Sequence, residues 1–203
     1  LLISQGANVN ATSRDGTNPL LAACIQNNWL DNIEIVKLLI SYTNNIDHRD
    51  NDGDTALILS VAEGAFGAAK ELINAGADVD IQSNNGKNAL LWASKNGYDE
   101  IVIDLLRRGA KVDKKDNEDM TALMYATDNN HTEIVEMLLN AGADRTEYDE
   151  AILYRQKEER ARDILDQLHD NNWDVYNWFR ESDIMSRYLF DNNVDVNYLD
   201  TIN

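Results

Sequence analysis

Hydrophobic residues recur along this chain in two kinds of short block. The first kind reads "GTNPLLAACIQN", "GDTALILSVAEG", "GKNALLWASKNG" and "DMTALMYATDNN", and the four copies superimpose without gaps. Pro19, Ala56, Ala89 and Ala122 occupy the same place in the four copies, 37, 33 and 33 residues apart. Within each copy the apolar residues stand three and four positions apart, which predicts one face of a short α-helix.

A second block follows each of the first. These blocks read "IEIVKLLISYTNNID", "GAAKELINAGADVD", "DEIVIDLLRRGAKVD" and "TEIVEMLLNAGADRT", and each predicts a second helix. Gly76, Gly109 and Gly142 stand where that helix should end in a left-handed residue. Each unit therefore contains a turn, a short helix, a tight connection and a second helix. A single unit of this size cannot bury its own apolar face, so the units must stack.

These blocks resemble the ankyrin repeat, whose hallmarks are T-P-L-H-x-A in the first helix and a glycine after the second, on a period of 33. The resemblance covers residues 1 to about 146. It implies an all-α fold: a solenoid of stacked helix-turn-helix units with projecting β-turn fingers. Only Pro19 keeps the proline of the motif, and its histidine is replaced by Leu21, Ile58, Leu91 and Met124.

Two further departures concern the turns and loops. Asp119 replaces the finger glycine of the fourth unit, which costs about 1 kcal/mol if the left-handed conformation is kept. Four extra residues near 28–32 lengthen the loop of the first unit and contain Trp29, which the repeat does not require.

The repeats are expected to form one continuous solenoid domain. "DILDQLHDNNWDV" aligns with "EIVEMLLNAGADR" and indicates a degenerate fifth unit, and "LFDNNVDVNYL" repeats "LHDNNWDVYNW" 21 residues later. Either one long closing helix or a truncated sixth unit ends the chain. The divisions are 1–16 (second half of an N-terminal repeat), 17–49 (repeat 1, with the 28–32 insertion), 50–82, 83–115 and 116–148 (repeats 2 to 4), 149–175 (degenerate repeat 5) and 176–203 (helical cap or truncated repeat 6).

The aromatic residues near the end of the chain fit a structural role. Trp178 and Phe179 are expected on the apolar face of a closing helix, in preference to a ligand site. Trp173 takes the place of an alanine in the repeat, so it either fills a gap or projects. The missing half-unit at the start and the unfinished finger at the end suggest a chain cut within a solenoid.

Composition narrows the classes of partner. The chain has 203 residues and a formal net charge of −18, which disfavours nucleic acid and anionic lipid and favours a basic partner. Its apolar runs are far shorter than the roughly 20 residues of a membrane helix, so no membrane association is expected. A single cysteine, Cys24, fits a reducing compartment. We therefore expect a cytoplasmic protein, in a bacterial cytosol or in a host cytosol if it is a secreted effector; no targeting signal can be read.

No set of converging catalytic groups is evident, and we expect no catalytic residue, no cofactor and no metal. Cys24 lies in a small-residue stretch typical of a buried structural thiol. His48, His131 and His169 belong to three different units, and His131 is expected to bond backbone groups. "DNDGD" at 50–54 reads as a finger tip, because the glutamate of a calcium loop is absent.

The ankyrin resemblance implies that a partner binds the concave face formed by the finger tips and the exposed positions of the first helices. The positions carried over are Arg14, Asp15, Thr17, His48, Asn51, Asp52, Asp54, Glu63, Asn84, Asn85, Lys87, Lys95, Asn96, Asn117, Glu118, Met120, Asp128 and Asn129. Tyr98, Met120, Trp29 and Trp92 are the large side chains that fit binding hot spots, although Trp92 replaces a core leucine and favours a structural role.

Charge is unevenly distributed over the units. Residues 113–150 contain eleven acidic and three basic residues, whereas the third unit contributes Lys87 and Lys95 to the expected surface. The acidic concentration either steers a basic partner or only keeps the solenoid soluble.

The sequence thus favours a non-catalytic protein–protein interaction module that acts as a scaffold, targeting domain or inhibitor. Its Asn-rich style resembles bacterial or viral members of the family, of the effector or immunity type. We expect a protein partner with a basic surface patch, no nucleic acid, no membrane and a monomeric state. The alternatives are the substrate-recognition part of a larger enzyme and a structural role in holding an oligomer together.

Overall fold

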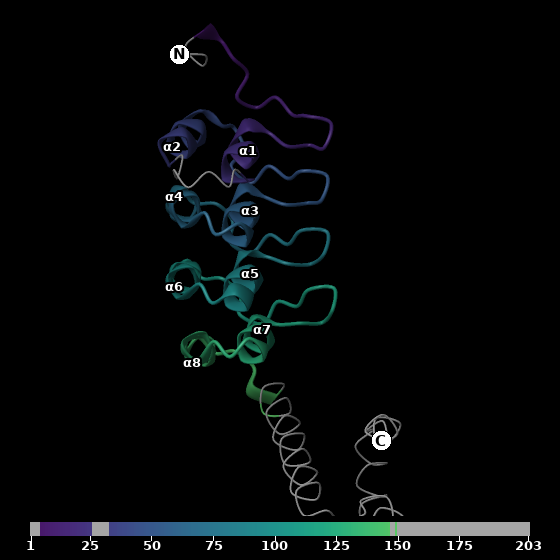
Figure 1. Cartoon of the computed structure of the whole chain (residues 1–203), viewed down its shortest axis with the longest axis vertical. Helices are drawn as coiled ribbons and strands as arrows, with labels where there is room; N and C mark the ends of the chain where they lie inside the picture. Colours follow the sequence, from purple (N-terminus) through teal and green to yellow (C-terminus); the bar gives the residue numbers. More distant parts are fainter. Residues whose placement is uncertain (1–4, 26–32, 147–148, 150–203) are drawn as a thin grey trace, which may run out of the picture. The chain divides into compact units, whose positions relative to one another are not determined.

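A computed structural model describes residues 5–25, 33–146 and 149 of this chain. These residues contain eight α-helices, arranged as four pairs along the chain (Figure 1). The helices are α1 (Pro19–Ile25), α2 (Ile33–Tyr42), α3 (Ala56–Ala62), α4 (Phe66–Ala75), α5 (Ala89–Asn96), α6 (Asp99–Arg107), α7 (Ala122–Asp128) and α8 (Thr132–Asn140). None of the described helices is long and apolar enough to cross a membrane.

The pairs stack in the order of the sequence. The first helices of the pairs, α1, α3, α5 and α7, contact one another in succession and form an inner column. The second helices, α2, α4, α6 and α8, form an outer column beside it, and each contacts its own inner helix. Extended loops project from the start of the inner helices to one side of the stack (Figure 1). The arrangement confirms the predicted all-α solenoid with fingers.

Polar caps begin the inner helices. The side chain of Asn18, Thr55, Asn88 or Thr121 accepts a hydrogen bond from the backbone N–H three residues later, at 2.9 to 3.3 Å. Each cap satisfies one N–H group that the first helical turn leaves without a partner. Helices of seven or eight residues are marginal in isolation, so packing and caps together hold them.

Left-handed glycines end the outer helices, as the sequence predicts. Gly76, Gly109 and Gly142 have φ angles of +89°, +82° and +93°. Asp119 keeps the left-handed conformation of the finger glycine that it replaces, with a φ of +60°. The expected backbone cost at Asp119 therefore applies.

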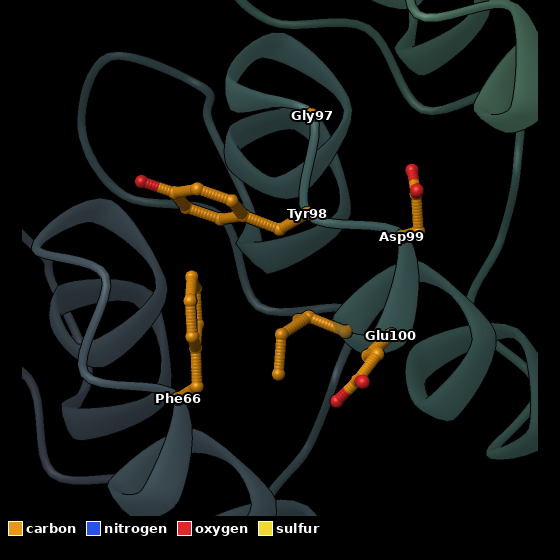
Figure 2. Close-up of a pocket in the computed structure, with 6 residues that line it drawn as sticks. Phe66, Gly97, Tyr98, Asp99 and Glu100 are labelled. Carbon is orange, nitrogen blue, oxygen red and sulfur yellow. The ribbon is translucent and has the colours of Figure 1, made fainter.

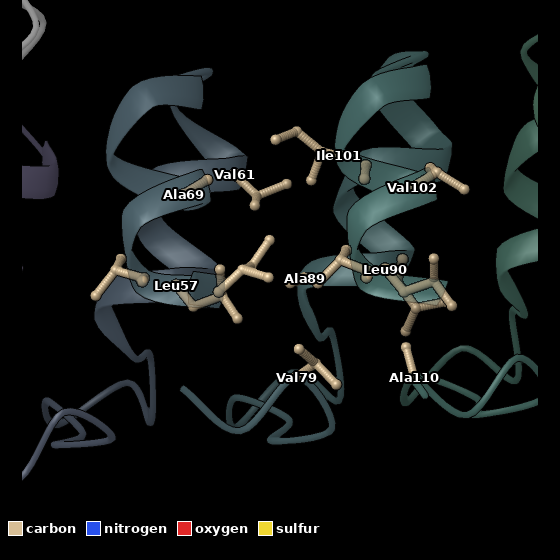
Figure 3. Close-up of a cluster of buried hydrophobic side chains, with 14 of the residues drawn as sticks. Leu57, Val61, Ala69, Val79, Ala89, Leu90, Ile101, Val102 and Ala110 are labelled. Carbon is tan, nitrogen blue, oxygen red and sulfur yellow. The ribbon is translucent and has the colours of Figure 1, made fainter. Parts of the chain in front are cut away.

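The core lies between the two columns and continues from unit to unit (Figure 3). Leu57 and Leu90 occupy the same place in successive inner helices, and Leu72 and Leu105 do so in the outer helices; all four side chains are buried. Cys24 is also buried, and burial raises the pKa of its thiol to about 12. This agrees with the structural role predicted for it.

Several predictions lie outside the described residues. They concern the 28–32 insertion with Trp29, the fifth unit with His169 and Trp173, and the closing segment with Trp178 and Phe179. The division of the chain into individual repeats stays a prediction.

Candidate partner-binding surface

The fingers are stacked on one another by backbone hydrogen bonds. In each case an asparagine N–H donates to a carbonyl of the preceding finger. The bonds run from Asn51 to Asp15 (2.9 Å), from Asn84 to Asp52 (2.9 Å) and from Asn117 to Asn85 (3.2 Å). Four fingers therefore form one continuous surface.

The side chains of Asn51, Asn84 and Asn117 reinforce this stack. Each side-chain amide donates to a second carbonyl of the preceding finger, at Arg14 (3.1 Å), Asn51 (2.9 Å) and Asn84 (2.8 Å) respectively. All three asparagines remain exposed at the tips. Each asparagine therefore uses one side-chain N–H to hold the shape of the surface.

We expected Lys87 to contribute an exposed positive charge to this surface, and this expectation is wrong. Its residue is only 8% exposed, and its Nζ lies 2.7 Å from Asp116 Oδ2 in the fourth finger. Tyr125 donates its hydroxyl to the same carboxylate oxygen at 2.6 Å. Burial opposes ionisation of Asp116, but the hydrogen bonds from Lys87 and Tyr125 outweigh it and lower the pKa of the carboxyl to about 2.

The charge of Lys95 faces aromatic rings. Its Nζ lies 5.5 Å from the ring centre of Trp92 and 5.4 Å from that of Tyr125, within cation–π range. Trp92 packs against the core, in agreement with its structural assignment. Lys87 and Lys95 are therefore both held by neighbouring side chains.

Acidic side chains provide most of the exposed charge among the expected binding positions. Asp15 and Asp52 lie at finger tips, Glu118 lies in the fourth finger, and Glu63 and Asp128 lie at the ends of α3 and α7; all five are exposed. Hydrogen bonds from Ser13 and Thr17 lower the pKa of the Asp15 carboxyl. Asp54 is half-buried, and burial together with the charge of Asp50 raises the pKa of its carboxyl.

Not every acid is available to a partner. Asp47, Asp80 and Asp113 each accept a backbone N–H from the following unit, at 2.9 to 3.0 Å. Asp50 and Asp116 each accept two N–H groups within their own fingers. Part of the acidic composition is therefore structural, including two of the acids in the 113–150 segment.

A family model described as ankyrin repeats (3 copies) matches the chain over residues 1–83 and 61–149. The chain belongs to the ankyrin-repeat family. Ankyrin repeats generally mediate protein–protein interactions and are typically non-catalytic. No curated protein matches the chain.

The remaining predicted residues of the ankyrin surface differ in their distance from the fingers and in their exposure. Glu63, Lys95 and Asn96, together with Asp128 and Asn129, lie at the ends of inner helices whose first residues adjoin the fingers. With a rise of 1.5 Å per residue, this separates them from the fingers by about 10 Å. Met120 is half-buried against the core, whereas Arg14 and Asn85 are exposed and Thr17 is half-buried.

The two described histidines join neighbouring ankyrin units. His48 is half-buried, and its Nε2 lies 2.8 Å from the Gly16 carbonyl, so it is less exposed than a finger position predicts, and its contact with a partner stays a prediction. The Nε2 of His131 lies 3.2 Å from the Lys95 carbonyl, which confirms its predicted bond to the backbone. "DNDGD" forms a finger tip, as predicted, with Asp50 bonded to the backbone of Asp52 and Asp54.

A further set of contacts escaped the sequence analysis. Arg49 donates to the Gln82 carbonyl at 2.8 Å, and Gln82 donates to the Lys115 carbonyl at 2.7 Å. These three residues occupy the same position in successive ankyrin units. The signal in the sequence was that long side chains with N–H donors recur at this one position of the repeat. Among the described residues, no group of three or more potential ligand side chains is placed to hold a metal ion.

Proposed function

We propose that this chain is a non-catalytic binding module that captures a protein through its finger tips and the exposed ends of its inner helices. The partner carries a basic surface patch. The module acts as a scaffold, a targeting domain or an inhibitor, in the manner of a bacterial or viral effector or immunity protein. It works as a monomer in a cytoplasm, where its single buried thiol fits a reducing environment.

One observation supports a positively charged partner. Lys87 is buried against Asp116, and Lys95 lies over two aromatic rings, whereas Asp52 and Glu118 are exposed. The surface is therefore more acidic than its residue types alone indicate. Acidic surfaces speed the association of basic partners and select against acidic ones.

The rigid stack of fingers supports the same proposal. Backbone and asparagine bonds connect the four fingers, so little conformational entropy is lost at the tips when a partner binds. A preorganised surface loses less free energy on association than a mobile one.

The test is charge reversal on two faces of the solenoid. A partner is first isolated by crosslinking and identified, and its affinity is then measured by calorimetry with the purified proteins. We expect the double variant Asp52→Lys with Glu118→Lys to weaken binding at least tenfold, about 1.4 kcal/mol, and to reduce the salt dependence of the affinity.

The matched control reverses the exposed acids Glu34 and Glu136 of the outer helices in the same way. This control should bind as the unmodified protein does. If instead the outer-helix variant loses the partner and the finger variant keeps it, the proposed surface is wrong.

A further inference from the structure

Each contact between successive fingers joins a glycine of one finger to an asparagine of the next. Three such pairs are present: Gly16 with Asn51, Gly53 with Asn84 and Gly86 with Asn117. A β-carbon added to these glycines would lie 3.0, 3.0 and 2.6 Å, respectively, from the backbone nitrogen of the asparagine. The asparagine thus approaches so closely that the residue beneath it can carry no side chain.

At the opposite end of the inner helices, the contacts between units change from one pair of units to the next. The second and third units meet there through Phe66 and Tyr98, whose ring centres are 4.6 Å apart in an edge-to-face contact (Figure 2). The third and fourth units meet there through His131, whose ring would lie 2.6 Å from a β-carbon on Gly97. The finger contact keeps the same two residue types at all three junctions, so a departure from it is informative.

The fourth finger departs from this arrangement at Asp119. This residue holds the place of the three glycines and keeps their left-handed conformation, with a φ of +60°. Its β-carbon therefore points into the space that a following finger would occupy. Asp119 is exposed, whereas Gly53 and Gly86 are buried beneath the next finger.

The asparagine of the pair is also replaced in the sequence. One period of 33 residues after Asn117 stands Glu150, which has no side-chain amide to donate. The glycine and the asparagine are therefore lost together, and an acid takes each place. Two carboxylates in a stacked pair of this kind would repel each other.

The fourth finger consequently has backbone acceptors without donors. In the first three fingers, a side-chain amide and a backbone N–H of the next finger bond two successive carbonyls. The corresponding carbonyls of the fourth finger belong to Asn117 and Glu118, and no described residue donates to them. An open edge of backbone groups of this kind can pair with another segment of chain.

We propose that Asp119 ends the finger stack and protects its open edge. The side chain occupies the space of a following asparagine, so no further finger of this repeat type can stack on the fourth. Charged residues at an open edge are a general means of preventing such pairing. The inference goes beyond the proposed function, because no partner protein takes part in this contact.

Moving the acid to the third finger tests the block directly. Gly86→Asp gives the third finger the residue of the fourth, and it should free the Asn117 N–H from the Asn85 carbonyl. Hydrogen exchange followed by NMR measures the protection of this amide. We expect its protection to fall at least tenfold, while the Asn84 N–H, which bonds the second finger, keeps its protection.

The matched control is Gly109→Asp in the same unit. Gly109 is also left-handed, with a φ of +82°, but a β-carbon there meets no atom within 4 Å. This variant adds the same charge and backbone strain without blocking a finger, so the protection of the Asn117 N–H should stay unchanged. Unchanged protection in Gly86→Asp, or an equal loss in both variants, would overturn the proposal.

A chain with an added unit tests Asp119 itself. Residues 116–148 are inserted a second time after residue 148, so that Asn117 of the second copy follows residue 119 of the first copy by one period. We expect the second Asn117 N–H to be at least tenfold more protected when the first copy carries Asp119→Gly than when it keeps Asp119. Similar protection with either residue, whether high or low, contradicts the role of Asp119 as the end of the stack.

Discussion

At the scale of single residues, Asp116 connects the third and fourth units. One oxygen of its carboxylate accepts from Lys87 and Tyr125, and the other accepts the backbone N–H groups of Glu118 and Met120. Burial opposes the positive charge of Lys87, yet the bonds to Asp116 and Tyr125 raise its pKa overall. The cluster therefore stays ionised in the fold, with one negative and one positive charge, and fixes the fourth finger against the third finger and α7.

Replacement of Asp116 by asparagine should destabilise the chain. A buried lysine without its partner costs about 3 to 5 kcal/mol, so we expect a loss of that order at pH 7 in urea unfolding. The exposed Glu118→Gln serves as the control and should change stability by less than about 0.5 kcal/mol. A loss below about 1 kcal/mol in Asp116→Asn would contradict the assigned role of the ion pair.

The same carboxylate predicts a pH dependence. Its pKa is about 2 in the fold, below the ordinary 3.8. Its contribution to stability is therefore complete above about pH 4 and is lost as the pH falls through 2. The difference between the unmodified chain and Asp116→Asn should shrink over this interval.

At the scale of elements, the fingers depend on glycines for two reasons: a left-handed backbone angle and the close approach of the next finger. Gly53 and Gly86 have φ angles of +78° and +81°. A β-carbon on Gly86 would lie 2.6 Å from the backbone nitrogen of Asn117, which lies over it in the next finger. Asp119 holds the same position in the fourth finger and is exposed. The left-handed angle alone is tolerable, whereas the close approach of the next finger excludes a side chain.

Opposite substitutions at the two positions should change stability in opposite directions. Gly86→Ala adds strain and a clash with Asn117, and we expect a loss of about 2 to 4 kcal/mol. Asp119→Gly relieves the φ strain without removing a finger contact, and we expect a gain of up to about 1 kcal/mol. Thermal and urea unfolding of both variants measure these changes in the free energy of unfolding. An unchanged stability in Gly86→Ala would show that the fingers can move apart to accept a side chain.

At the scale of the whole molecule, repulsion between the many acidic residues opposes the stacking of the units. The chain carries a formal charge of −18, and acids recur in each of the described stacked units. The described ion pairs between outer helices, such as Lys37–Glu71 and Lys70–Glu100, are largely exposed. Exposed pairs contribute little, so repulsion between like charges dominates the long-range electrostatics.

Salt should therefore stabilise the fold. We expect the melting temperature, followed by circular dichroism, to rise by a few degrees between about 10 and 200 mM NaCl, because the Debye length shortens from about 30 Å to less than 10 Å. Sodium sulfate is avoided, since it also strengthens hydrophobic burial. A melting temperature that falls with NaCl would show that the exposed ion pairs outweigh the repulsion.

The sequence by itself determined the features that local chemistry controls. Spacing of apolar residues, polar caps such as Thr55 and glycines such as Gly76 define where each helix begins and ends, because these effects act within a few residues. The period of 33 then implied stacking, because no unit can bury its apolar face alone. The helical solenoid and the buried Cys24 were predictable for these reasons.

Only the tertiary structure decided which polar side chains remain available to a partner. Lys87 looks like a finger cation in the sequence, but Asp116 lies 29 residues away and meets it only when the units stack. His48 is engaged in the same way by Gly16, and Phe66 meets Tyr98 only across two units. Contacts between units depend on pairs of residues about one repeat apart, and a single unit's pattern does not contain them.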